Sequence, residues 1–231
     1  MRSRRLAVFL VGVAVTVLPA LASRADEKPG HDPHADHGAH DSHAGHASHG
    51  DLPGTAPLAS ESVYQLEGRW KRAPEGEIAL AELRGKPVVM LLFYGTCQAV
   101  CPILVRDVQR IEEGLSPAER ERVRFVLVSF DPQVDTPAAL AAYAKKQGLS
   151  ADRFILLHGD PGQVRELAAV LGVRYRPVAE GQYSHTQRIS VLDRDGKVAA
   201  HFDGLERPVS GMVDRVREEI GNTGAAAKTG S

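Results

Sequence analysis

The sequence of 231 residues has little cysteine and almost no net charge. Its two cysteines, Cys97 and Cys101, are too few for a framework of stapling disulfides, which favours a functional site for them. A net charge of −1, with acidic and basic residues mixed along the chain, gives no electrostatic footprint for nucleic acid. The length leaves room for one domain of ordinary size with tails. We therefore expect a single folded domain, a monomer, with no nucleic-acid partner.

A long hydrophobic run is missing as well. The apolar stretch near the N-terminus, over 6–18, falls short of the roughly 20 residues that a membrane-spanning helix needs. Basic residues precede it and small residues follow it up to Ala22, which is the order of a secretory signal. We predict a signal peptide over 1–22, with an uncleaved anchor close to the membrane as the alternative. Either form places the protein in the periplasm or cell envelope, and an arginine-rich start of this kind suggests a bacterium.

Histidine, in contrast, is abundant over 31–49, where it recurs at every third position. Polyproline II has three residues per turn, so in that conformation these imidazoles would line one side. Asp, Gly, Ala and Ser separate them, a composition that cannot bury a core. We interpret 23–61 as a disordered tail and linker that weakly binds Cu(II), Zn(II) or Ni(II); the alternative is a solubilising linker. The seven histidines are His31, His34, His37, His40, His43, His46 and His49.

The folded domain is predicted over 62–220, with a flexible tail over 221–231. Apolar runs of strand character alternate in it with segments typical of helices. The expected strands are an edge strand at 64–66 and runs over 77–80, 88–94, 123–130, 154–157, 187–193 and 198–202, the last two forming a hairpin. The expected helices lie over 102–114, 137–147, 163–171 and 209–220. This order indicates an α/β thioredoxin-like fold, with a central mixed sheet flanked by helices.

Both cysteines lie where the buried strand over 88–94 gives way to a helix, with Cys101 expected near the N-cap and Pro102 at the first helical position. Spaced four apart, they can place both sulfurs on one side of the first turn, where amide donors and the helix dipole favour thiolate. Thiolates bind soft metals and attack disulfides. A structural disulfide is the alternative, but closing so small a loop contributes only on the order of 2 kcal/mol or less. After export, the pair needs a reductant or a metal to avoid oxidation.

Three histidines of the folded domain are candidates for a third ligand: His158, His185 and His201. Two thiolates and one imidazole suit copper as Cu(I) or Cu(II), whereas a closed zinc site usually takes four protein ligands. His185 is expected in the loop that enters the final hairpin, which in a thioredoxin-like sheet faces the cysteine helix. We therefore predict His185 as the ligand, and interpret the other two as packed or exposed histidines.

Asp131 and Asp135 lie close in the sequence and resemble the paired carboxylates of a functional site. Asp131-Pro132, however, is typical of a turn, and Asp135-Thr136 of a helix cap, so we expect a local structural role for both.

Three stretches together carry a resemblance to a known family: FYGTCQAVCP at 93–102, VSFDPQVDTP at 128–137, and YSH at 183–185 ahead of VLDRDGK at 191–197. In this order they resemble the Sco/SenC family of copper-handling proteins, over roughly 62–220. The resemblance implies a thioredoxin-like domain that binds one copper ion through Cys97, Cys101 and His185. It also implies a client such as a respiratory oxidase subunit, whose CuA site receives copper or has its cysteines reduced.

Two positions depart from the family pattern. Gln98 follows the first cysteine, where the family commonly has proline, and Ser184 precedes the histidine, where many members have an acidic residue. Neither departure removes one of the expected ligands.

A thiol-disulfide oxidoreductase is the alternative function, with Cys97 as the attacking and Cys101 as the resolving cysteine of a redox-active pair. The C-x-x-x-C spacing counts against this function, since thioredoxins have C-x-x-C. The loop directly before Ile189 also lacks the proline that related reductases usually carry there. A peroxidase is disfavoured, because the neighbourhood of a lone peroxidatic cysteine is missing around Cys97.

Overall fold

The computed structural model describes residues 62–205 and 207–226. The predicted signal over 1–22 and the histidines over 31–49 lie outside these residues. Within them, no helix combines the length and the apolar character needed to cross a membrane.

Three parallel strands form the centre of the fold: β3 (Val88–Phe93), β4 (Arg124–Ser129) and β5 (Phe154–His158). In the described residues they belong to a seven-stranded sheet of order β2-β1-β5-β4-β3-β8-β9. Every residue of β3 is buried, as its unbroken apolar run predicts, because helices cover both faces of the sheet. The predicted buried strands at the centre are thereby confirmed.

Antiparallel strands complete both sides of the sheet. β8 (Arg188–Leu192) pairs with β3, and β9 (Val198–Asp203) pairs with β8 as the predicted hairpin. On the other side, β1 (Trp70–Arg72) pairs with β5, and β2 (Glu77–Ile78) pairs with β1. The sheet is therefore mixed, as expected.

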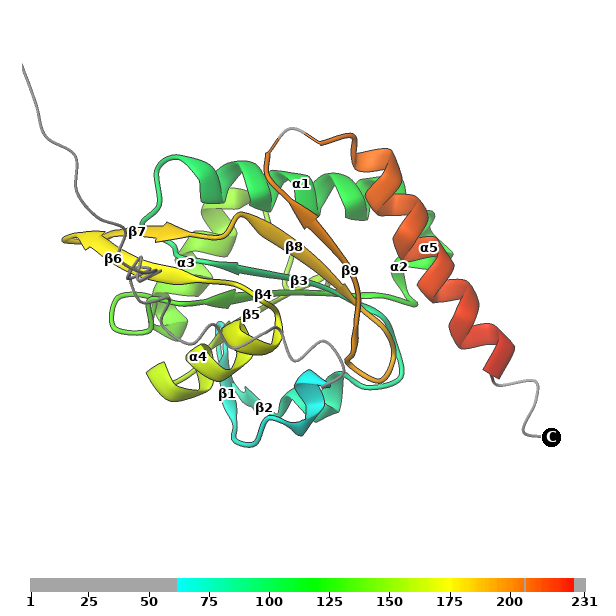
Figure 1. Cartoon of the computed structure of the whole chain (residues 1–231), viewed down its shortest axis with the longest axis horizontal. Coiled ribbons are helices and arrows are strands. Elements are labelled where there is room, and N and C mark those ends of the chain that lie inside the picture. The colour runs from blue at the N-terminus through cyan, green and yellow to red at the C-terminus, as the bar shows by residue number, and fades with distance from the viewer. Residues whose placement is uncertain (1–61, 206, 227–231) are drawn as a thin grey trace, which may run out of the picture. The chain divides into compact units, whose positions relative to one another are not determined.

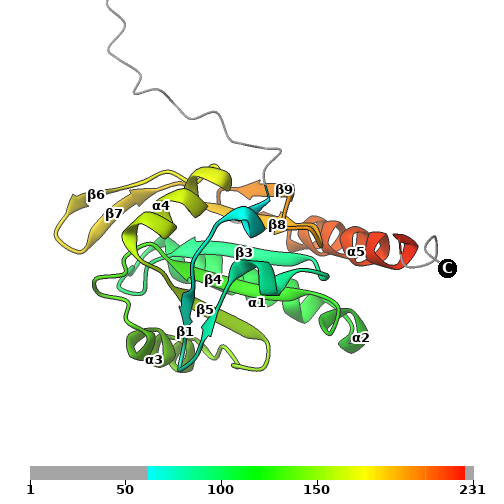
Figure 2. The ribbon, with the colours of Figure 1, turned by 90° about the horizontal axis from the view of Figure 1, so that it is seen from below.

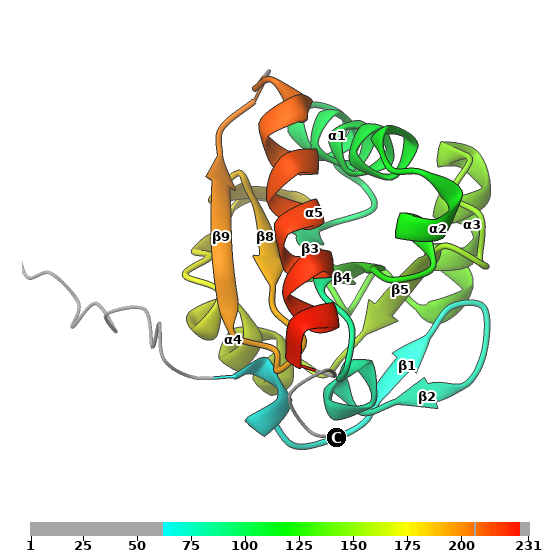
Figure 3. The same ribbon diagram turned by 90° about the vertical axis from the view of Figure 1, so that its right-hand side faces the viewer.

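The helices form the outer layers. In Figure 3, α1 (Val100–Gly114), α3 (Pro137–Gln147) and α5 (Val209–Ala226) lie on one side of the sheet, and α4 (Pro161–Val170) lies on the other. A short α2 (Pro117–Arg120), which was not predicted, follows α1. This arrangement of helices on both faces of a mixed sheet confirms the predicted fold class.

Several of the predicted element boundaries are wrong. Residues 64–66 do not form an edge strand, because Val63–Gln65 is a 3-10 helix, η1, capped by the Ser62 hydroxyl that accepts the Tyr64 N–H at 3.1 Å. A second 3-10 helix, η2 (Leu80–Leu83), takes the end of the strand expected over 77–80. α4 begins two residues early, at a proline, because the Asp160 carboxylate caps it. The last helix, α5, continues six residues beyond 220.

A second, two-stranded sheet lies outside the main one. It consists of β6 (Tyr175–Ala179) and β7 (Gln182–His185), joined by a turn with Gly181 at φ 63°, and it projects beside α4 (Figures 1 and 2). The sequence did not predict this hairpin, since most of its residues are exposed and show little apolar alternation. Its position matters, because β7 ends in the predicted ligand histidine.

Candidate functional site

The two cysteines lie at the junction of β3 and α1, as the sequence predicts. In the connecting turn, the Cys97 N–H donates to the Tyr94 carbonyl at 3.3 Å. α1 begins at Val100, so Cys101 is already inside the first turn and Pro102 is the third helical residue. The predicted start at Pro102 was two residues late; proline also fits here, because the first N–H groups of a helix have no partner within it.

The thiol pair is buried and asymmetric. Cys97 is 6% exposed and Cys101 is 0% exposed, and both are free. Burial raises the pKa of the Cys97 thiol. Hydrogen bonds from the backbone N–H groups of Cys101 and Ala99 stabilise the thiolate more strongly, so that this pKa lies below its ordinary value. One of these contacts, from the Cys101 N–H to Cys97 Sγ, measures 3.3 Å. Burial raises the pKa of Cys101 far above the ordinary range. Cys97 is therefore the sulfur that ionises first.

His185 lies beside the second cysteine. Its Nε2 is 3.7 Å from Cys101 Sγ, and its Nδ1 is 3.0 Å from the backbone oxygen of Thr186. A carbonyl oxygen can only accept, so Nδ1 carries the proton in the neutral ring and Nε2 directs its lone pair at the sulfur. The prediction of a loop for His185 was wrong, because this residue ends β7 and pairs with Tyr175 of β6.

Aromatic rings attach the β6–β7 hairpin to the rest of the domain. The rings of Phe130 and Tyr175 stack with centroids 4.8 Å apart, and the rings of Tyr94 and Tyr183 meet edge to face at 5.1 Å. Phe130 also contacts the His185 imidazole, at 5.2 Å. Such pairs contribute about 0.5–1.5 kcal/mol each beyond their burial. These aromatic contacts hold His185 in place. They were not predicted from the sequence, although Tyr175 and Tyr183 on either side of the Gly181 turn were an available signal.

A buried carboxylate braces the turn that leads to Cys97. Asp135 Oδ2 accepts the Gly95 N–H at 2.8 Å and the Ser129 hydroxyl at 2.5 Å. A Cβ at position 95 would lie 2.6 Å from Asp135 Oδ1, so this close approach needs glycine. The cap of α3 is Thr136 alone, whose hydroxyl accepts the Ala139 N–H at 3.2 Å. The expected cap is thus confirmed for Thr136, whereas the Asp135 carboxylate supports the site, a role the sequence analysis missed.

Asp131 matches its predicted role as a turn residue. Its carbonyl accepts the N–H groups of Val134 and Asp135 at 3.1 and 2.9 Å. The side chain is buried, and it contributes to a raised pKa of Tyr183, for which burial is the main cause.

The other two candidate histidines contact groups other than the sulfurs. Nδ1 of His158 contacts the backbone oxygen of Asp135 at 3.0 Å, and Nδ1 of His201 contacts the Ser190 hydroxyl at 3.2 Å. Over 62–205 and 207–226, no three His, Cys, Asp or Glu side chains are gathered closely enough to hold a metal ion as they stand. The contact between Cys101 and His185 is thus one pair of donors, not a complete metal site.

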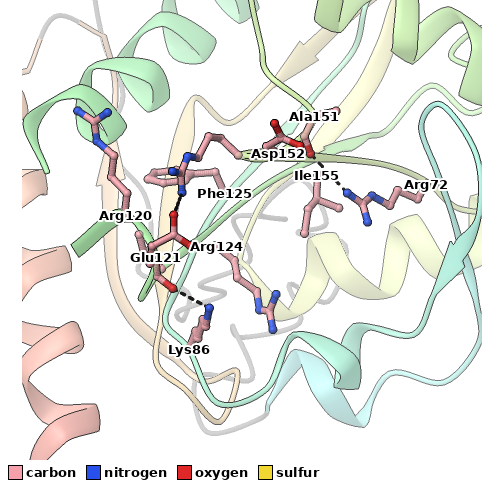
Figure 4. Close-up of a pocket in the computed structure, with 11 residues that line it drawn as sticks. Arg72, Lys86, Arg120, Glu121, Arg124, Phe125, Ala151, Asp152 and Ile155 are labelled. Carbon is pink, nitrogen blue, oxygen red and sulfur yellow. Dashed lines mark hydrogen bonds and ion pairs between the residues drawn. The ribbon is translucent and has the colours of Figure 1, made fainter. Parts of the chain in front are cut away.

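A separate hollow of about 190 Å³ lies at the opposite end of the parallel strands (Figure 4). Its cations include Arg72, Lys86 and Arg124, each of which donates to a backbone carbonyl at 2.6 to 3.4 Å. Lys86 precedes β3 and Arg124 begins β4, whereas the cysteines follow the carboxyl end of β3. Ligand sites of such sheets lie beyond the carboxyl ends of the strands. We therefore place the candidate site at the thiols and not in this hollow.

Known proteins share both the sequence pattern and the fold. The family model described as SCO1/SenC matches residues 72–221. A protein of Stutzerimonas stutzeri, provisionally named copper-binding protein, is 28% identical over 145 residues, which cover 58% of this chain and 70% of the relative. The structure of Bradyrhizobium japonicum ScoI with copper bound is 24% identical, with a TM-score of 0.53 over 65% of this chain and 96% of that chain.

A further solved relative is BsSco, described as a member of the Sco family of cytochrome c oxidase assembly proteins and reported with a disulfide switch. It is 23% identical, with a TM-score of 0.60 over 68% of this chain and 94% of that chain. Likeness at these identities shows a common fold. Since the family model also spans well over half of the sequence, including the turn with both cysteines, the chain belongs to the SCO1/SenC family.

Proposed function

We propose that this protein is an exported copper metallochaperone that binds one copper ion through Cys97, Cys101 and His185, and delivers it to, or prepares, the CuA site of a respiratory oxidase. The observation that carries the proposal is the distance of 3.7 Å between Cys101 Sγ and His185 Nε2. Zinc, which like Cu(I) is a d10 ion, makes bonds of about 2.3 Å to thiolate and about 2.05 Å to imidazole, so two donors on one such ion at tetrahedral to trigonal angles lie about 3.6–3.8 Å apart.

The chemistry of the donors supports copper as the cargo. Thiolates favour Cu(I), and a neutral imidazole suits both copper oxidation states. The hydrogen bond from His185 Nδ1 to the Thr186 carbonyl orients the ring and leaves Nε2 available, as is usual for ligand histidines. Cys97 supplies the third donor in the proposed complex, and a thiolate there can accept the Cys101 N–H, which lies 3.3 Å from its sulfur.

The burial of the donors suggests an order of ligand exchange. Cys101 is fully buried, whereas Cys97 retains some exposure and His185 is half-buried. An incoming client ligand therefore displaces Cys97 or His185 before Cys101. The predicted signal and the tail over 31–49, which lie outside the described residues, would add export and a first capture of metal ions.

The test is a Cu(I) titration of the reduced full chain, in the presence of a chelator strong enough to keep copper off the histidine tail. The wild type should bind about one equivalent, and His185→Ala should weaken binding by about 10-fold or more, because one of three donors is lost. His158→Ala is the matched control, since that imidazole bonds elsewhere. Unchanged binding by His185→Ala would contradict the proposed ligand set.

The asymmetry of the thiols favours a second candidate function, a thiol-disulfide reductase. In that reaction the Cys97 thiolate attacks a client disulfide, forms a mixed disulfide and releases one client thiolate, which takes up a proton. Cys101 then loses its proton and attacks Cys97 Sγ, which releases the second client thiol and leaves the pair oxidised. A Cys101→Ala variant should trap the mixed disulfide, whereas Cys97→Ala should not. Absence of the trapped species with an oxidised CuA domain would argue against this activity.

A further inference from the structure

The hollow at the amino ends of the parallel strands collects positive charge (Figure 4). Among the residues that line it, the basic ones are all half-buried, whereas the acidic ones are exposed. The hollow measures about 190 Å³, which is smaller than the roughly 300–1,000 Å³ of clefts that hold drug-sized molecules, so its size suits a small ion or a single chemical group. The basic residues are Arg72, Lys86, Arg120, Arg124 and Arg153, and the acidic residues are Glu121 and Asp152.

Two of these basic side chains are already neutralised by carboxylates. Arg153 forms an ion pair with Glu121 at 2.6 Å, and Arg120 forms one with Glu112 at 3.3 Å. The remaining basic side chains of the hollow form no ion pair with a carboxylate of the described residues, so their positive charge is left to attract a ligand. They are Arg72, Lys86 and Arg124.

Strand pairing brings these three cations to one place. Lys86 directly precedes Pro87, whose carbonyl accepts the Arg124 N–H at 2.9 Å. Arg72 ends β1, which pairs with β5, and its guanidinium donates to the Ala151 carbonyl in the turn before β5 at 3.4 Å. Lys86 Nζ and Arg124 Nε also donate to backbone carbonyls, at 2.6 and 3.2 Å. One such bond orients each group and leaves most of its N–H donors available for a ligand.

The walls of the hollow strengthen the effect of these charges. Val123 and Phe125 are buried and Ile155 is half-buried, so the surface between the basic groups is apolar. A cleft that is lined by charge of one sign and has low-dielectric walls concentrates the electric field and attracts counter-ions. Asp152, the carboxylate of the hollow without an ion pair, is exposed and compensates only part of the charge. An anion in the hollow therefore relieves the repulsion among the three cations.

We propose that this hollow binds a phosphate group, either inorganic phosphate or a phosphate monoester, held by Arg72, Lys86 and Arg124. A phosphate monoester carries a charge of about −1.5 to −2 at pH 7 and has three strong acceptor oxygens, which matches three cations. A carboxylate has a single charge and two oxygens, both of which one guanidinium engages, so it leaves two cations uncompensated. The inference goes beyond the proposed function and does not depend on it, because the thiols lie past the opposite ends of the strands.

The experiment titrates the full-length protein with inorganic phosphate in a calorimeter, at constant ionic strength and at pH 8, where the histidines of the tail are mostly neutral. The test variant is Arg72→Gln with Arg124→Gln. The matched control is Arg174→Gln with Arg176→Gln, which removes the same two charges from exposed positions on the β6–β7 hairpin, outside the hollow. A second test variant, Lys86→Gln, removes the third cation by itself. Thermal unfolding of each preparation shows whether it is folded.

We expect the wild type and the control to bind about one equivalent of phosphate, and the Arg72→Gln, Arg124→Gln variant to bind it about 10-fold more weakly or worse, because two of three charged donors are lost. Lys86→Gln should show a smaller loss in the same direction. Phosphate at about 100 times its Kd should raise the Tm of the wild type by about 5–10 °C, and acetate at the same ionic strength should not.

A second arm identifies the source of the phosphate group. The full-length protein is sedimented with vesicles of phosphatidylcholine, with and without phosphatidic acid, whose head group is a phosphate monoester. Binding that requires phosphatidic acid and is lost in the Arg72→Gln, Arg124→Gln variant would support the site with a lipid as its ligand. Binding of inorganic phosphate without binding to these vesicles would support it with a soluble phosphate.

Several outcomes would overturn the inference. One is a folded wild type that neither binds inorganic phosphate nor gains Tm in its presence, and that ignores phosphatidic acid. Equal weakening in the test variant and the control would reduce the effect to overall charge, and an equal rise of Tm in acetate would reduce it to non-specific binding of anions. If the arginine variant shows no unfolding transition, Lys86→Gln decides, and its unchanged affinity would refute the site.

Discussion

Replacement of Asp135 by alanine tests whether the buried carboxylate organises the cysteine turn. It removes the acceptor of two hydrogen bonds, from the Gly95 N–H and from the Ser129 hydroxyl. Hydrogen bonds to a charged group contribute about 1.5–3 kcal/mol each, and the cost of burying the carboxylate offsets part of this. We expect Asp135→Ala to lower the free energy of unfolding by about 3 kcal/mol, or Tm by about 6–12 °C at 2–4 °C per kcal/mol.

Asp135→Asn provides the comparison. The amide oxygen can still accept both hydrogen bonds, so this variant should retain most of the stability and most of the affinity for Cu(I), whereas the alanine variant should lose both. Thermal unfolding followed by circular dichroism, together with the Cu(I) titration, measures the two effects. Equal stability of the alanine variant and the wild type, or equal losses in both variants, would refute a bracing role for the carboxylate.

The buried Asp135 carboxylate also predicts that the free energy of unfolding depends on pH. Burial is the main cause that raises the pKa of Asp135 in the folded state above its value in the unfolded chain, which is about 3.9. The folded protein therefore binds more protons between the two pKa values, so this group makes stability fall as pH rises through the folded pKa. The difference in unfolding free energy between wild type and Asp135→Asn should follow this slope above pH 4, and a flat difference would contradict it.

Three more predictions concern reactivity and packing. In the reduced protein near pH 7, iodoacetamide should modify Cys97 and leave Cys101 unmodified until unfolding, because their pKa values shift in opposite directions. Gly159→Ala should lower the unfolding free energy by about 1–3 kcal/mol in denaturant titrations, since its Cβ would meet Trp70 at 2.4 Å. Arg188→Gln should cost about 1–3 kcal/mol, because two hydrogen bonds to a carboxylate on β9 and two to backbone carbonyls are lost.

Each of these has its own control. Alkylation of both cysteines at equal rates in the folded protein would contradict the asymmetry of the pair, and peptide mapping distinguishes the two sites. Gly211→Ala is the control for Gly159→Ala, since nothing lies near its added Cβ, and similar losses in both would argue against a clash. Arg188→Lys keeps the charge but not the planar fork, so full stability in that variant would show that the geometry of the guanidinium is unimportant.

The cysteine turn was predictable because its signals are local. A continuous apolar run from Val88 ends in two cysteines and a proline, so strand, turn and helix follow from neighbouring residues alone. The same holds for α3, which starts at a threonine cap with proline behind it and ends at Gly148 in the left-handed region. The metal-binding role of the histidine tail stays a prediction, as does the signal peptide.

The neighbourhood of the thiols depends on contacts between distant segments, and local patterns do not encode it. Asp135 resembles a helix cap in the sequence, yet the fold directs its carboxylate to a turn 40 residues earlier. The β6–β7 hairpin has few apolar residues of its own and is placed by aromatic contacts with Tyr94 and Phe130. The sequence by itself determined the fold class and the position of both cysteines at the junction of a strand and a helix, whereas His185 as a metal ligand stays a prediction. Only the tertiary structure decided that His185 ends a strand 3.7 Å from Cys101, because that distance results from packing between parts of the chain 84 residues apart.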